Sequence, residues 1–470
     1  MRADYSIYNG GDFLNMNETH TKFERLTGDP VSKLILRLAV PTVLSMLIST
    51  LYNMADAFFV GQINASASGA ISVIFSYMAI IQAFGYFFGH GSGNYVSLKL
   101  GEQNREEAEK MAATGFFSSL AFGFFIMVLG LIFTDPLITM LGSTETIRPY
   151  AKEYLIWILL GTPYMTASLT LNNQLRFQGS ALYAMIALVS GGVINIGLDA
   201  VFVTVLGMGT GGAGLATAIG QLCSFCLLLS GTFFGGNLRL KIKNFQFKKF
   251  YFKVIAGGGL PSLGRQSVSG IATVCVNFVC KDVLGANADA MIGALGNVTK
   301  ITGFCNSIIL GFGQGFQPVC GFNYGAKNYK RVLRGFYFTL CCTTAFAAVV
   351  TVFGIVFARP LTAAFTVDDK VAEYSAAAFR AQCAFFVLSP WITVSSMLLQ
   401  NIGKVVRATA LAVTRQGVAF IPAVFVAGYI FGANGLVAAQ AVADLITFII
   451  AVPITVPVLK LLRKSENGVS

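Results

Sequence analysis

Two carboxylates, Asp56 and Asp199, stand inside long apolar segments that are otherwise typical of membrane-spanning helices. A charged side chain at bilayer depth is costly, so such a residue normally faces the interior of a helix bundle or a water-filled cavity. There it marks the path of an ion, a proton or a substrate. The two acids are therefore the candidate chemical centre of this chain.

Polar neighbours accompany both acids at helical spacing. Asn195 lies four residues before Asp199, so the two share one helical face. Two carboxylates in a dry pocket repel each other, and burial further disfavours ionisation, so at least one is expected to hold a proton near the working pH. With the oxygens of Asn195 and Thr217 they could also form the all-oxygen shell that hard cations prefer, which leaves H⁺ and Na⁺ both open. Asp56 ends a polar stripe that also contains Ser49, Tyr52 and Asn53.

A structural role is the alternative for the acids. Both lie within about seven residues of the following loop, at most roughly 10 Å deep at about 1.5 Å per residue. They could then only hydrogen-bond between helices or meet water at a helix end, and Asn and Thr commonly join helices in this way.

Composition predicts the elements that must position these residues. The 470 residues are 55% hydrophobic and 11% charged, whereas soluble domains carry roughly a quarter charged residues. Apolar stretches of about 20 residues can cross a bilayer as helices. We predict an all-α integral membrane fold with twelve transmembrane helices, in two pseudo-symmetric six-helix bundles around a central cavity. The predicted spans are 34–60, 68–92, 112–134, 150–173, 181–206, 211–234, 254–280, 287–318, 333–357, 374–402, 407–430 and 435–459.

The basic residues predict the orientation. Counted on alternate sides of these spans, 24 Lys and Arg fall on the side of both termini and six on the other, so both termini are expected in the cytoplasm. The segment 237–253 has six basic residues interleaved with aromatic ones and is expected to lie on anionic lipid rather than on nucleic acid. The predicted domains are an N-terminal segment 1–33, an N-lobe 34–236, the linker 237–253, a C-lobe 254–460 and a tail 461–470.

The two halves of the sequence repeat. Gly101 in SLKLGEQNREEAEK corresponds to Gly325 in GFNYGAKNYKRVLR (325 − 101 = 224), and Gly179 corresponds to Gly403 at the same spacing. Because six spans separate equivalent points, the halves are predicted to be parallel repeats.

No cofactor is expected. All nine Cys lie in or beside apolar segments, where thiols pack as small hydrophobic groups. With only two His in the chain, we expect no disulfide, zinc or haem site. The Gly-rich stretches lack the Lys-Ser/Thr ending of a nucleotide-binding loop, so ATP is not expected to drive the chain directly.

Several runs then resemble one family. LAVPTVLSMLISTLYNMADAFFVGQ, LNNQLRFQG, NIGLDAVFV and GQGFQPVCGFNYGAKNYKRV resemble multidrug and toxic compound extrusion (MATE) transporters, and their spacing is most similar to the MepA-like bacterial multidrug exporters. The resemblance covers the chain from about residue 30. It implies a twelve-helix antiporter of the bacterial cytoplasmic membrane that expels cationic, aromatic compounds in exchange for H⁺ or Na⁺. It implies no enzyme activity, and a monomer surrounded by membrane lipids is expected.

The resemblance also implies roles for particular residues. Ion coupling would fall to Asp56, Asn195, Asp199 and Thr217, the same set that could hold Na⁺. The resemblance places Tyr52, Tyr154 and Asn172 on the substrate cavity, and Ser49 and Asn53 of the polar stripe are predicted to line it as well. Some relatives carry acids on the seventh and tenth helices, but here the first of these positions is surrounded by Arg265, Gln266, Ser267 and Ser269, which argues against coupling through those acids.

Four charged residues remain inside spans of the second half: Arg265, Lys300, Arg415 and Asp444. We predict a charge-compensating network that stabilises the bundle, in which Asp444 lies near at least one of the bases. A direct role in substrate handling is the alternative.

Three other functions would each require particular sequence features. A flippase for lipid-linked precursors, from the same superfamily, would be expected to carry cationic residues for a pyrophosphate in its cavity. A polyprenyl transferase would need an Asp-rich metal motif, and no DxxD or DDxxD occurs. A pore is disfavoured because a two-fold repeat favours rocking bundles over a symmetric ring.

Overall fold

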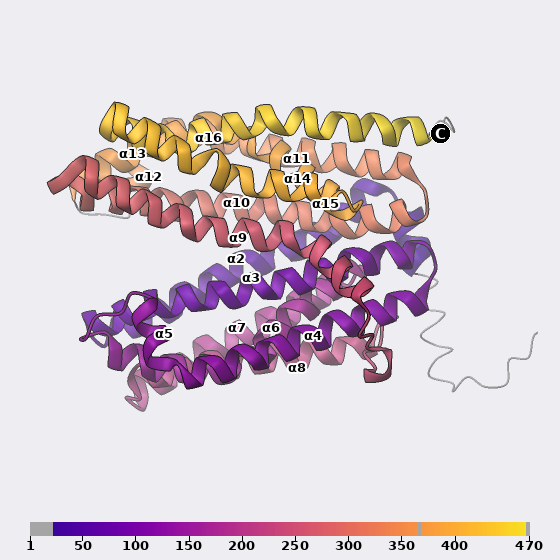
Figure 1. Ribbon diagram of the computed structural model, residues 1–470, viewed down its shortest axis with the longest axis horizontal. Helices are drawn as coiled ribbons and strands as arrows, with labels where there is room; N and C mark the ends of the chain where they lie inside the picture. The colour runs from indigo at the N-terminus through magenta and orange to yellow at the C-terminus, as the bar shows by residue number, and fades with distance from the viewer. Residues whose placement is uncertain (1–21, 365–367, 467–470) are drawn as a thin grey trace, which may run out of the picture. The chain divides into compact units, whose positions relative to one another are not determined.

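The structure is a computed structural model that describes residues 22–364 and 368–466 (Figure 1). Within these ranges every regular element is helical and no strand occurs. The all-α membrane architecture predicted from the sequence is therefore confirmed. Of the predicted N-terminal segment 1–33, residues 1–21 lie outside the described ranges, as do residues 467–470 of the predicted tail.

The chain divides into two compact units. The first contains the described residues up to Gly259 together with Gly321–Asn328, and the second contains Leu260–Cys320 and the described residues from Tyr329 onward. The predicted lobe boundaries at 34–236 and 254–460 stay a prediction.

The first unit is organised around α6, which packs against α3, α4 and α8, while α7 packs against α2 and α8. Two of its helices begin at asparagines whose side chains cap them. Asn64 accepts a hydrogen bond from the Ala67 amide at 2.7 Å, and Asn104 accepts one from the Glu107 amide at 3.1 Å. Such caps satisfy backbone donors that a helix start leaves free. The elements are α2 (Val31–Gly61), α3 (Ala65–Gly101), α4 (Arg105–Ile132), α5 (Thr134–Met140), α6 (Arg148–Phe177), α7 (Ala181–Asp199), the π-helical η1 (Ala200–Val205) and α8 (Gly209–Ser230).

Short 3-10 turns, η2 (Gly231–Phe233) and η3 (Ile242–Asn244), follow α8. The remaining elements are α9 (Lys249–Leu284), η4 (Gly285–Asn287), α10 (Ala288–Gly325), α11 (Tyr329–Val356), α12 (Ala358–Ala363), α13 (Asp369–Phe386), α14 (Ser389–Asn401), α15 (Val405–Val413), the π-helical η5 (Thr414–Val418) and α16 (Phe420–Glu466). In the second unit α13 packs against α11 and α16.

The number of spans agrees with the predicted twelve. Over the described residues, nine helices are long and apolar enough to cross a membrane, and α13 and α14, bent by 55°, make a tenth span. One of the nine, Val405–Glu466, contains a kink at Gly432, whose φ of +59° is accessible mainly to glycine, so it can form two spans. The twelfth is α10, which has 38 residues but contains Asn297, Lys300 and Asn306.

The internal repeat is present in the backbone as well as in the sequence. Helices α4 and α11 have both their first and their last residues separated by the 224 residues of the sequence repeat. Helices α6 and α14 end at the same spacing. So do backbone positions with positive φ, which are Gln103 at 59° and Lys327 at 57°, and Gly179 at 81° and Gly403 at 76°. Each half of the sequence therefore folds with the same local geometry.

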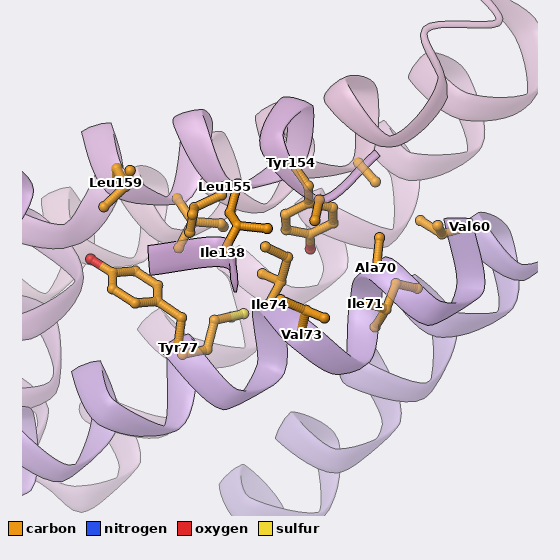
Figure 2. Close-up of a cluster of buried hydrophobic side chains, with 14 of the residues drawn as sticks. Val60, Ala70, Ile71, Val73, Ile74, Tyr77, Ile138, Tyr154, Leu155 and Leu159 are labelled. Carbon is orange, nitrogen blue, oxygen red and sulfur yellow. The ribbon is translucent and has the colours of Figure 1, made fainter. Parts of the chain in front are cut away.

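A cluster of buried apolar side chains fills the first unit beside α6 (Figure 2). Its members come from α2, α3, α5, α6 and α8 and include Val60, Ile71, Ile74, Ile138, Leu155 and Leu159. Tyr154 belongs to this cluster and is 1% exposed. Because protein interiors are close-packed, the cluster holds the Tyr154 ring in one position and so fixes where its hydroxyl points.

Candidate functional site

Asp56 is held by a tyrosine from another helix. The carboxylate lies on α2 and is 3% exposed. The Tyr154 hydroxyl on α6 donates a hydrogen bond to Asp56 Oδ2 at 2.9 Å, and the same hydroxyl lies 3.1 Å from Thr217 Oγ1 on α8. A hydrogen bond to a charged acceptor is stronger than one between neutral groups. Tyr154 therefore links the acid on α2 to the hydroxyl on α8.

Asn195 and Asp199 complete the cluster from α7. The Asn195 amide donates to Thr217 Oγ1 at 3.2 Å. Asp199 is fully buried at the last position of α7, where the helix passes into the π-helical η1. Its carboxylate is close enough to interact electrostatically with Asp56 and with Tyr154. The structure thus brings together all four residues predicted for ion coupling.

The cluster has unused hydrogen-bonding capacity, and all of it is oxygen. Four buried oxygen atoms have no hydrogen-bond partner: Asp56 Oδ1, Asn195 Oδ1 and both carboxylate oxygens of Asp199. Among the described residues neither carboxylate forms an ion pair. Buried polar atoms are normally satisfied, so a group of unsatisfied ones suits a bound proton or cation. These oxygen donors also fit a hard cation such as Na⁺.

Two glycines on α8 bring its neighbours close enough for these bonds. A Cβ on Gly214 would lie 2.7 Å from the backbone oxygen of Tyr154, and one on Gly220 would lie 2.8 Å from the Cβ of Asn195. Thr217 stands midway between the two glycines, and it contacts both Tyr154 and Asn195. The spacing Gly-x-x-Thr-x-x-Gly is the sequence signal that could have placed α8 between α6 and α7.

The residues predicted to line the substrate cavity differ in their hydrogen-bond partners. Tyr154 lies within the carboxylate cluster described above. Asn172 Nδ2 donates to the Ala184 carbonyl at 3.1 Å and so joins α6 to α7. The Tyr52 hydroxyl accepts a bond from Gln221 at 3.5 Å, a partner that sequence reasoning missed although Gln221 lies one helical turn after Thr217. Cavity lining by this group, which also includes Ser49 and Asn53, stays a prediction.

The second unit contains a different polar cluster. Arg415, inside η5, donates from Nε to Asp444 Oδ1 at 2.8 Å and from Nη2 to Oδ2 at 3.3 Å. Gln440 donates to Asp444 Oδ1 at 3.0 Å, and Arg415 Nη1 lies 3.4 Å from Asn306 Oδ1. Asp444 is fully buried. It does lie against one of the predicted bases, and the role of this network stays a prediction.

The other two bases line hollows beside that ion pair. A cavity of about 570 Å³ is lined by Lys300 and Arg415, and a second of about 280 Å³ by Arg265 and Arg415. The two share Asn306 and Gln416 as well as Arg415, so they adjoin. No acid lines either cavity among the described residues. The cavities of the second unit are therefore lined by positive charge, whereas the polar cluster of the first unit contains acids.

Comparisons with known proteins agree with this architecture. The model of the MatE family matches residues 41–201 and 267–425. The multidrug export protein MepA of Staphylococcus haemolyticus is 24% identical over 429 residues, which cover 90% of this chain and 92% of that protein. MepA of Staphylococcus aureus is 23% identical over 434 residues, which cover 88% and 91%. The solved structure of a MOP superfamily transporter from Pyrococcus furiosus matches with a TM-score of 0.87 and 24% identity, covering 94% of this chain and 98% of that one.

Proposed function

Because the chain belongs to the MatE family, we propose that it is a secondary active antiporter that exports cationic or aromatic compounds in exchange for H⁺ or Na⁺. The observation that carries this proposal is the cluster of Asp56 and Asp199, two buried acids without a basic partner in the described chain. An unpaired carboxylate inside a membrane protein is costly unless a proton or cation neutralises it. The charge of such a site changes when a proton or cation binds.

Exchange follows from the charge of the cluster. When a proton or Na⁺ occupies it, one of the two negative charges is neutralised and the repulsion between the acids is relieved, so the bundle can close around them. When the site is empty, the charged acids favour a state that admits water or a cationic substrate. An ion that stabilises one state over the other shifts the equilibrium between them by its difference in affinity. The organic cation and the coupling ion then compete for the same negative charge.

The substrate class follows from the relatives and from the composition. The matched Staphylococcus proteins are named multidrug export proteins. The chain has 41 Phe, 16 Tyr and 13 Met, and flexible or aromatic side chains can adapt to varied flat cations. Ser49, Tyr52, Asn53 and Asn172 are the proposed polar lining of the substrate path. These relatives do not favour the flippase alternative.

The location proposed for this exporter is the bacterial cytoplasmic membrane. The excess of Lys and Arg on one side supports cytoplasmic termini, and the basic aromatic segment 237–253 would lie along anionic lipid. Function as a monomer is proposed, since each unit carries its own polar cluster.

Efflux of a cationic dye from proteoliposomes under an imposed pH or Na⁺ gradient tests the proposal. Asp56→Asn and Asp199→Asn are each expected to abolish the gradient-driven part of efflux, because an amide cannot exchange charge with the coupling ion. The matched control is Asp135→Asn, which alters an exposed acid of the same unit that pairs with Lys152 at 3.0 Å. Whichever gradient drives the parent identifies the ion, and undiminished efflux in both buried-site variants would refute the coupling role.

A further inference from the structure

The second unit contains a hollow whose charge does not suit an organic cation. We call it the basic cavity; it comprises the two adjoining cavities, and its polar lining includes Arg265, Lys300, Asn306, Arg415, Gln416 and Gln440. We propose that it binds the anionic group of an exported amphiphile, so that carboxylate-bearing compounds are substrates. This inference rests on the proposed export function and adds to it a substrate class.

Charge is the first argument. Three cationic side chains line the basic cavity and no acidic one does among the described residues. Asp444, behind the wall, is fully buried and already paired with Arg415. It offsets the charge of Arg415, whereas Lys300 adds a positive charge that no ion pair among the described residues offsets. An organic cation entering here would be repelled, whereas an anionic group would be attracted.

Lys300 is the group most available to a ligand. It lies twelve residues after the start of α10, roughly 18 Å along the helix at about 1.5 Å per residue, and its side chain is exposed. Within the described part of the chain, its side chain forms no ion pair or hydrogen bond. A lysine at that depth normally faces water, a counter-ion or a ligand rather than acyl chains.

The remaining lining suits the rest of an amphiphile. Arg415 is held in place from behind by Asp444, so its guanidinium does not need to be ordered by the ligand. Asn306, Gln416 and Gln440 add amide groups, while Val276, Leu295, Phe420 and Leu436 make part of the wall apolar. A volume of about 570 Å³ lies in the range typical of small-molecule sites.

Binding of two rhodamine dyes that differ at one group tests the inference. One carries a free carboxylate, and the other is its methyl ester, which lacks that negative charge. Fluorescence anisotropy with the purified full-length chain is expected to show tighter binding of the free acid. Lys300→Gln should weaken the free acid roughly tenfold or more, because it removes a charge-assisted contact, and should leave the methyl ester unchanged. Lys300→Arg should retain the preference.

The control is Lys281→Gln, an exposed lysine at the end of α9 that lines neither cavity. Equal affinity of both dyes for the parent, or the same result for Lys300→Gln and Lys281→Gln, would overturn the inference. A lipid headgroup could supply the same anionic chemistry, so binding is repeated in nanodiscs with and without phosphatidylglycerol. If that lipid abolishes the free-acid preference of the parent, the cavity holds lipid and the substrate assignment is wrong.

Failure of the export function would be recognised separately. Gradient-driven efflux of the methyl ester by the parent depends on the Asp56 and Asp199 cluster, so it is measured independently of dye discrimination, and Lys281→Gln, which lies outside both cavities, should preserve it. If the parent binds both dyes equally but exports the ester normally, only the proposed binding of anionic groups in the basic cavity is refuted. Normal discrimination without gradient-driven efflux refutes only the antiporter.

Discussion

Replacing Tyr154 by Phe isolates the polar contact at the centre of the carboxylate cluster. The ring stays in its apolar surroundings (Figure 2), and only the hydroxyl is lost. Among residues 22–364 and 368–466, that hydroxyl is the only hydrogen-bond donor to the Asp56 carboxylate, through Oδ2 at 2.9 Å, and its second contact is with Thr217 at 3.1 Å. After the change, neither oxygen of Asp56 has a partner in the cluster.

The magnitude follows from the type of bond. A hydrogen bond to a charged acceptor contributes about 1.5–3 kcal/mol, and one to a neutral hydroxyl contributes about 1 kcal/mol. Tyr154→Phe therefore removes more hydrogen-bond free energy from Asp56 when the carboxylate is ionised than when an ion or proton has neutralised it. The empty site is destabilised relative to the ion-bound site. The difference between the two losses is about 0.5–2 kcal/mol. At about 1.4 kcal/mol per factor of ten, half-maximal efflux should need roughly 2- to 30-fold less coupling ion.

The assay is dye efflux over a series of H⁺ or Na⁺ concentrations, together with thermal unfolding of the purified protein. Tyr77→Phe is a matched control from the same apolar cluster: Tyr77 is 2% exposed and its hydroxyl lies 3.0 Å from that of Thr162. This control should lower the unfolding free energy by about 1 kcal/mol and leave the ion dependence unchanged. In an Asp56→Asn background, Tyr154→Phe should lower the unfolding free energy by a different amount than in the parent, with a coupling energy of about 0.5–3 kcal/mol.

Two results would refute this reasoning. One is an identical ion dependence for Tyr154→Phe and Tyr77→Phe. The other is additivity of Tyr154→Phe and Asp56→Asn in the double variant, because contacting residues that act through one bond must couple.

Two further perturbations test the packing around each polar cluster. Gly220→Ala places a Cβ 2.8 Å from that of Asn195, so it should lower the unfolding free energy by about 1–3 kcal/mol and reduce efflux. Gly197→Ala, whose added Cβ would have no atom within 4 Å, should change neither quantity. Equal melting temperatures of the two variants would contradict the close approach of α7 and α8. Asp444→Asn leaves Arg415 without its carboxylate and should lower the unfolding free energy by about 3–5 kcal/mol. Combining Asp444→Leu with Arg415→Met should recover most of the melting temperature. If Asp444→Asn is as stable as the parent, the pair has no stabilising role.

Much of the fold could be predicted because helix ends and membrane spans depend mainly on the nearby sequence, which repeats in the two halves. The 224-residue repeat was visible in Gly101 and Gly325, and it reappears in the ends of α4 and α11. Span prediction was also reliable, since long apolar runs have few alternatives to helix in a bilayer. It separated the two spans on either side of Gly432, where a single positive φ kinks α16.

The site was only partly predictable because its contacts are distant in sequence. Asn195 and Asp199 share a face by spacing alone, but Tyr154 and Asp56 are 98 positions apart, and no local pattern shows which hydroxyl meets which acid. The resemblance to the family places Tyr154 among the residues that face the substrate cavity, which stays a prediction, and the bond from its hydroxyl to Asp56 came only from the structure. The π-helical turns η1 and η5, beside Asp199 and around Arg415, were also not predicted, since their hydrophobic pattern hardly differs from that of an α-helix.

The two units share a backbone pattern but not a chemistry, and this difference bears on where coupling occurs. In the first unit Asp56 and Asp199 have carboxylate oxygens without a hydrogen-bond partner, and no basic residue of the described ranges pairs with them, so a proton or Na⁺ can bind there. In the second unit Asp444 is already neutralised by Arg415 through two hydrogen bonds. A coupling ion could bind there only by displacing a guanidinium and leaving it buried without a counter-charge, which costs several kcal/mol. In the proposed antiport mechanism the coupling ion should therefore act in the first unit alone.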